Sequence, residues 1–112
     1  MGYTSIQIDF DEAYALAKRL EDCAEEMKRL AAQRMENALS EMAAGWKGES
    51  AAAYFARAET TKEAIISTSE KLGSIASSIR RQAKRTYDAE MAALRLAEER
   101  TSGSGGGGGR AF

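Results

Sequence analysis

The sequence predicts an all-α protein, built as an antiparallel two-helix hairpin that dimerises into a four-helix bundle. Three observations predict this fold. The 112 residues include 22 alanines, no proline and no valine, a composition that favours long helices and disfavours a sheet. Apolar residues recur at three- and four-residue steps, as on one face of an amphipathic helix. A single glycine-containing break, at residues 45–49, separates two such stretches.

The first helix is expected over residues 9–44, after an unpacked N-terminal arm at residues 1–8. Asp9 is in position to cap the helix, and Glu12 completes a capping box three residues later. Gly45 suits the left-handed conformation that commonly follows a helix C-terminus. The apolar stripe of this helix comprises Phe10, Ala13, Ala17, Leu20, Ala24, Met27 and Ala31, and continues less regularly through Met35, Leu39 and Met42.

The second helix is expected over residues 50–100, after a W-x-G turn at 45–49. Its apolar pattern has two sets of positions at heptad spacing, namely 58, 65, 72, 79 and 61, 68, 75, 82. Beyond Ile79 the stripe shifts to Ala83, Tyr87, Met91 and Leu94. Residues 101–112 are expected to form a flexible glycine-rich tail that ends in Phe112.

A hairpin of two helices leaves apolar side chains on its outer faces. Small domains with too little core commonly bury such surface by associating. We therefore expect a dimer, either of two identical chains or with a related helical hairpin. The expected interface residues are Leu20, Met27, Ile65, Leu72, Ile75 and Ile79.

No constellation of residues points to catalysis, a metal or a cofactor, and we expect none of the three. The chain has no histidine and one cysteine, Cys23, so it offers no histidine base, no intrachain disulfide and no cysteine-only metal site. Its acidic residues are spread over solvated helix faces instead of converging across a cleft.

Charge and hydropathy exclude two further classes of partner. A formal net charge of −1, with no aromatic residue interleaved in the basic run at residues 80–85, argues against nucleic-acid binding. No apolar run approaches the roughly 20 residues that a membrane span needs, so stable membrane insertion is not expected. The first ten residues have neither the basic nor the apolar region of a cleaved secretory signal.

The single tryptophan lies in the break between the two expected helices, as Trp46-Lys47-Gly48. A tryptophan at such a turn can cap the apolar end of a hairpin and still offer its indole N–H to a partner. This W-x-G, in mid-chain and between two amphipathic helices, resembles the WXG-motif family, the ESAT-like small proteins exported by type VII secretion systems. The resemblance covers residues 5–100 and includes the small and aromatic residues that follow the turn, up to Phe55.

The family also carries a C-terminal Y-x-x-x-[DE] export element, which in related proteins pairs with the W-x-G of the partner chain. Tyr87 is placed like the tyrosine of that element, but the residue four positions later is Met91 and not an acid. Asp88 and Glu90 lie close by, and Glu90, at i+3, is on nearly the same helix face as position i+4. The resemblance thus implies an export and recognition set of Trp46, Gly48, Tyr87, Asp88 and Glu90.

The resemblance implies a small non-enzymatic protein that is exported from the cytoplasm as a folded dimer, without a cleaved signal peptide, after recognition by a secretion ATPase. It leaves open an alternative, a WXG-like targeting partner or chaperone. Such a chain binds the N-terminal helical domain of a larger exported toxin and delivers it to the ATPase. A helical bundle without any export role is a third interpretation. A strong homodimer favours the first interpretation, and a chain that stays loose until its partner binds favours the second.

Overall fold

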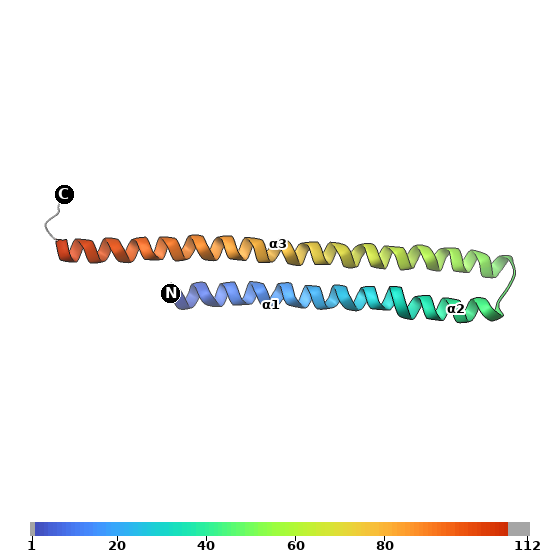
Figure 1. Ribbon diagram of the computed structural model, residues 1–112. Coiled ribbons are helices and arrows are strands. Elements are labelled where there is room, and N and C mark those ends of the chain that lie inside the picture. Colours follow the sequence, from blue (N-terminus) through green and yellow to red (C-terminus); the bar gives the residue numbers. More distant parts are fainter. Residues whose placement is uncertain (1, 108–112) are drawn as a thin grey trace. The chain divides into compact units, whose positions relative to one another are not determined.

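The computed structural model describes residues 2–107, with side chains over residues 2–101. Every described residue outside 46–48 is helical. The elements are helix α1 (Gly2–Arg29), the π-helical segment η1 (Leu30–Met35), helix α2 (Glu36–Gly45) and helix α3 (Glu49–Gly107) (Figure 1). The all-α prediction is therefore confirmed.

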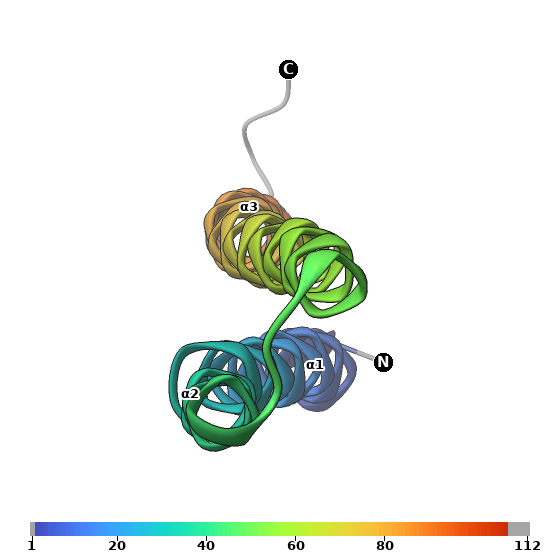
Figure 2. The ribbon, with the colours of Figure 1, turned by 90° about the vertical axis from the view of Figure 1, so that its right-hand side faces the viewer.

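The chain divides into two compact units, and each is described by itself. The turn unit comprises residues 17–77, in which the helices before and after residues 46–48 run antiparallel (Figure 1). Figure 2 shows the short connection that crosses from α2 to the start of α3. The terminal unit pairs residues 2–16 of α1 with residues 78–107 of α3, again antiparallel. The predicted two-helix hairpin is confirmed.

Small side chains line the seam along which the two helices of the turn unit face each other. Ala17, Ala31 and Ala76 have no exposed surface, and no large side chain among the described residues is fully buried. Small residues allow two helices to approach closely, and longer side chains are then displaced to the flanks of the contact. The other buried residues of this seam are Ala24, Ala51 and Ser69.

Only one of the two heptad sets noted in the second helix lies on the face that meets the first helix. Positions 58, 65, 72 and 79 are half-buried, whereas positions 61, 68, 75 and 82 are all exposed. The residues one position later, at 62, 69, 76 and 83, are buried or half-buried instead. Together with 58, 65, 72 and 79 they give alternating steps of four and three, the spacing of one continuous helix face.

The π segment η1 accounts for the irregular end of the first apolar stripe. From Ala31 onward the half-buried positions are Met35, Leu39 and Ala43, at uniform steps of four. A π turn uses one residue more than an α turn, so it returns residues at this wider spacing to the seam. Met42, which was expected in the stripe, is 39% exposed, and Ala43 takes its place.

Helix α1 begins at Gly2, so the expected unpacked arm is helical over residues 2–8, and Asp9 is an interior residue instead of the N-cap. Contacts with α3 in the terminal unit account for this difference. The Tyr3 hydroxyl donates a hydrogen bond to Glu98 Oε1 at 2.8 Å. These contacts give the first turns of α1 a partner that the capping pattern does not reveal.

Helix α3 continues through Gly107, beyond the expected end at Arg100. The Thr101 hydroxyl donates to the carbonyl oxygen of Ala97 at 2.9 Å, within the continuing helix. The expected tail is thus helical over residues 101–107. Its remainder, residues 108–112 with Phe112, lies outside the described residues.

One charged side chain lies at the alanine seam. Lys62 of α3 has a side chain only 15% exposed, and it pairs with Glu36 of α2 across the seam. It also pairs with Glu59, one turn earlier on its own helix, at 2.7 Å. The hydrogen bonds to Glu36 and then Glu59 raise the pKa of Lys62 above its ordinary value. The ammonium group is therefore charged and ties α2 to α3.

Enlarging a seam alanine should destabilise the hairpin. Ala76 is fully buried, so Ala76→Leu forces the helices apart and is expected to cost about 1–3 kcal/mol of unfolding free energy. The matched control is Ala56→Leu at an exposed position of the same helix, with a change within about 0.5 kcal/mol. Thermal unfolding followed by circular dichroism measures both. Equal stabilities of the two variants would contradict the seam.

The contact between Tyr3 and Glu98 predicts a pH dependence. This hydrogen bond raises the pKa of Tyr3, because the phenol donates it and the phenolate cannot. The stabilisation is present below the unfolded-state pKa of about 10 and is lost as pH rises through the higher folded-state pKa. The ultraviolet difference between wild type and Tyr3→Phe should therefore titrate above that of a free tyrosine, and Glu98→Gln should lower the midpoint. An ordinary midpoint in the wild type would exclude the contact.

Candidate functional site

The W-x-G turn is built from two backbone features. Trp46 leaves the helix in an extended conformation, with φ −117° and ψ 115°, while its N–H still donates to the Met42 carbonyl oxygen at 2.9 Å. Gly48 has φ +112°, a conformation that residues with a Cβ rarely adopt. Its carbonyl oxygen accepts the Ala52 N–H at 3.0 Å and so starts α3. The expectation of a left-handed conformation at Gly45 is therefore wrong. Gly45 is the last residue of α2, and Gly48 adopts the positive φ of the turn.

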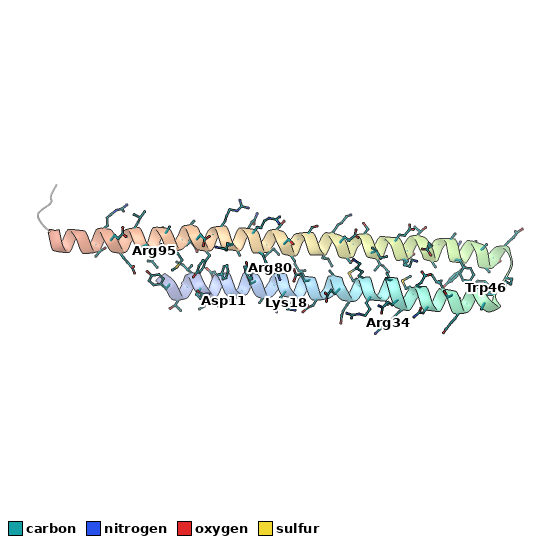
Figure 3. The ribbon with its side chains drawn as sticks, in the orientation of Figure 1. Asp11, Lys18, Arg34, Trp46, Arg80 and Arg95 are labelled. Atoms are coloured by element: carbon teal, nitrogen blue, oxygen red, sulfur yellow. The ribbon has the colours of Figure 1, made fainter. Side chains whose placement is uncertain are left out.

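Trp46, labelled in Figure 3, lies at the turn and belongs to an aromatic cluster. Its ring centroid lies 5.4 Å from that of Tyr54 and 5.7 Å from that of Phe55, with the Phe55 ring edge-on. Tyr54 and Phe55 lie 5.9 Å apart, again edge-on. Trp46 and Tyr54 each remain 39% exposed despite these contacts. The cluster therefore holds the indole in place and still presents apolar surface to solvent.

Tyr87 has an internal role in the terminal unit. Its ring lies 4.7 Å from that of Phe10, and its hydroxyl donates to Gln7 Oε1 at 3.2 Å. The Phe10 ring in turn lies 4.5 Å from that of Tyr14. The Arg80 guanidinium stands 5.7 Å from the centre of the Tyr14 ring, a cation–π arrangement. Tyr87 thus helps to hold the start of α1 against α3.

The two candidate acids beside Tyr87 differ in their surroundings. Asp88 accepts a hydrogen bond from Lys84 at 2.9 Å, one turn earlier in α3, and this bond raises the pKa of Lys84. Glu90 lines a groove of about 270 Å³ that also exposes parts of Phe10 and Tyr87. The structure therefore brings Tyr87 and Glu90 together, whereas Asp88 is occupied by an ion pair.

A polar groove runs along one side of the seam in the turn unit. Its charged lining consists of four acids and two lysines, namely Glu21, Asp22, Glu25, Glu70, Lys18 and Lys28. Lys18 pairs with Asp22 at 2.9 Å within this lining. Ser69 and Gly73 of α3 complete the lining of the groove. The lining residues therefore identify the flank of each helix that lies on this side of the seam.

The other side of the seam is apolar. Residues three and four positions apart share a helix face, so the residues opposite the polar groove can be identified from their spacing. We call this surface the apolar face, and it consists of Leu20, Cys23, Met27 and Leu30 on the first half of the hairpin and Ile65, Thr68, Leu72 and Ile75 on α3. Leu30 is 42% exposed and Ile75 is 49% exposed. Five of the six expected interface residues lie here. The sixth, Ile79, is half-buried in the terminal unit, where it lines the groove beside Tyr87.

Sequence reasoning missed the internal partners of two candidate residues. The contact of Tyr54 with Trp46 is indicated in the sequence only by an aromatic residue soon after the W-x-G. Nothing in the sequence indicates that Gln7 accepts a hydrogen bond from Tyr87. Over residues 2–107, no group of three or more metal-ligating side chains gathers, and no helix is long and apolar enough to span a membrane.

Comparison with known proteins gives one match. A family described as proteins of 100 residues with WXG matches residues 5–91. The matched segment includes the W-x-G turn, the flanking parts of both long helices, and Tyr87 with Glu90. No curated protein and no solved structure matches the chain.

The two glycines of the turn region should respond to alanine in opposite ways. Gly48→Ala forces a Cβ into a positive-φ conformation and should cost about 1–2 kcal/mol of stability. Gly45 ends α2, and a Cβ added there would meet nothing within 4 Å, so Gly45→Ala should gain about 0.5–1 kcal/mol. Urea unfolding of the two variants checks this. The same sign for both would show that the positive φ is not where we place it.

Proposed function

Since the chain belongs to the WXG100 family, the ESAT-like substrates of type VII secretion systems, we propose that it is itself exported by such a system, folded and paired with a second helical chain. Members of the family are non-enzymatic helical proteins that are secreted without a signal peptide and dimerise with related proteins. Export and pairing of this particular chain are the steps that we add.

The observation that carries the proposal is the exposure of the aromatic cluster at the turn. Trp46 contacts two aromatic rings, yet 39% of its surface is left to solvent. A tryptophan that only sealed the end of a hairpin would be expected to bury more of itself, whereas binding hot spots are enriched in tryptophan. Gly48 holds the backbone turn that presents the indole.

The recognition surface that we propose is composite. The W-x-G turn lies in one unit and Tyr87 with Glu90 in the other. In the dimer, Trp46 and Gly48 of one chain lie beside Tyr87 and Glu90 of its partner, and the secretion ATPase reads both. Glu90 supplies the acid in place of Met91, because Asp88 is already paired with Lys84.

Pairing through the apolar face is supported by what the chain leaves exposed. Leu30 and Ile75 are more than two-fifths exposed on a face that also carries half-buried Leu20, Met27 and Leu72. Isolated apolar residues on a surface are ordinary, but a contiguous apolar face marks an interaction site. A second amphipathic hairpin would cover this face and complete a four-helix bundle.

A second candidate function uses the same face. As a targeting partner, the chain would bind the N-terminal helical domain of a larger exported toxin and accompany it to the ATPase. Methionines favour this alternative, since Met27, Met35 and Met42 all lie on the first half of the hairpin, and methionine adapts to differently shaped partners. The two candidate functions are distinguished by one question, whether export of this chain requires a larger exported protein. The targeting-partner function requires it.

Replacing Trp46 should separate recognition from folding. We expect Trp46→Ala to lower export by about tenfold or more, since truncating a binding hot spot costs about 2 kcal/mol or more. Phe55→Ala is the matched control, because it removes a ring of the same cluster that is less exposed and should cost stability without removing the presented surface. The amounts in culture medium and in cells, with and without the ATPase, measure export.

Circular dichroism of both variants shows whether each still folds. Equal export losses in the two variants, in proportion to their loss of stability, would reduce Trp46 to a structural residue. Normal export of a stably folded Trp46→Ala chain would refute the proposed recognition.

A further inference from the structure

The charges around the apolar face are mostly of one sign. On the first half of the hairpin, Arg19 and Arg34 flank it with one acid, Glu26, between them. Glu26, Arg29 and Arg34 line the same hollow as Cys23, Met27 and Leu30. On α3 the flanking charges are Arg57 and Lys71, two heptads apart. We call Arg19, Arg34, Arg57 and Lys71 the basic rim, and all four are exposed. Figure 3 shows Arg34 on the π segment.

Two acids of α3 within the turn unit lie on the opposite side. Glu70 lines the polar groove, and Glu63 lies one heptad earlier on the same flank. Glu59 forms an ion pair with Lys62 at the seam. The turn unit is therefore polarised across its seam, because acids outnumber lysines by four to two in the polar groove, whereas cations outnumber acids around the apolar face.

The cations of the basic rim have no internal partner. Arg19, Arg34, Arg57 and Lys71 make no ion pair with any residue that the structure describes. Lys18, Lys62 and Lys84 are each paired with an acid. Among the described residues Lys28 and Arg29 are unpaired as well, so what distinguishes the rim cations is their position around the exposed apolar surface.

This arrangement disfavours a symmetric homodimer through the apolar face. A two-fold interface brings the same patch of both copies together, whichever way the helices cross. Each copy contributes the four rim cations and Arg29, with Glu26 as the one acid beside them. Most rim cations of one copy would then lie near like charges of the other, and like-charge juxtaposition across an interface is unfavourable.

We propose that the partner on the apolar face is a different chain, an amphipathic helical hairpin whose own apolar face is edged by carboxylates. This inference rests on the proposed function, because it names the partner in the pairing step described there. The unpaired rim cations steer such a partner into place and form ion pairs around the apolar contact. The same cations reject a second copy of this chain.

A charge-reversed copy of the chain can stand in for the partner. The acid-rim variant carries Arg34→Glu, Arg57→Glu and Lys71→Glu, so its apolar face is unchanged and its rim is acidic. We expect wild type mixed with this variant to associate about tenfold or more tightly than wild type with itself at low salt. The difference should shrink near about 1 M salt, where the Debye length is about 3 Å. Sedimentation velocity gives the dissociation constants, and native mass spectrometry identifies the mixed pair.

The control variant reverses three acids on the other side, by Glu25→Lys, Glu63→Lys and Glu70→Lys. Mixing it with wild type should bring no gain through the apolar face. Circular dichroism shows that each variant is helical. An equal gain with this control, or wild type that pairs with itself as tightly as with the acid-rim variant, would overturn the inference.

Ile75→Glu, at an exposed position of the apolar face, distinguishes failure of this inference from failure of the pairing itself. If wild type forms a tight homodimer that Ile75→Glu abolishes, the pairing surface is right and the partner is a second copy. If Ile75→Glu leaves every association unchanged, or if no mixture associates, pairing through this face is wrong and the inference falls with it.

Discussion

The alanine seam is the constraint on which the rest of the structure depends. Ala17, Ala31 and Ala76 are fully buried where the helices of the turn unit meet, and none of the larger apolar side chains that the structure describes is fully buried. Because burial of apolar area is the main stabilising term in folding, a seam of methyl groups contributes little for its length. The leucines, isoleucines and methionines that would stabilise a thicker core lie at its flanks. The apolar face is thus a direct result of how closely the two helices approach.

The sequence predicted the elements well, because burial and periodicity are directly linked. The sequence did not predict features that no apolar spacing or capping pattern signals. Ile75 was expected at the dimer interface and is exposed, but the small Ala76 beside it, which the heptad pattern did not include, is the buried residue. The π segment has no characteristic residue composition. Its one sign in the sequence is the uniform four-residue spacing of the buried positions from Ala31 to Ala43. The helical start at Gly2 depends on contacts with α3 that no local capping pattern encodes.

For the candidate site, the turn was predictable and the surroundings were not. Trp46 and Gly48 could be singled out because tryptophan occurs once in this chain and glycine is the residue that a sharp turn favours, as the positive φ of Gly48 bears out. Helix spacing favoured Glu90 as a substitute acid but left Asp88 open. The ion pair with Lys84 distinguishes them. Tyr87 contacts Phe10 inside its own chain, so any role in recognition would be added to a structural one.

Lys62 has a consequence for the alignment of the hairpin. A seam of nearly identical small residues has many nearly equivalent alignments, since a slip of one heptad sets alanine or serine against alanine again. The slipped chain would separate the Lys62 ammonium from Glu36 and set it against methyl groups. A charge held against apolar groups without its partner is unfavourable, whereas exchanging one methyl contact for another changes little. The single cation among the alanines therefore selects one alignment from a set that its neighbours scarcely distinguish.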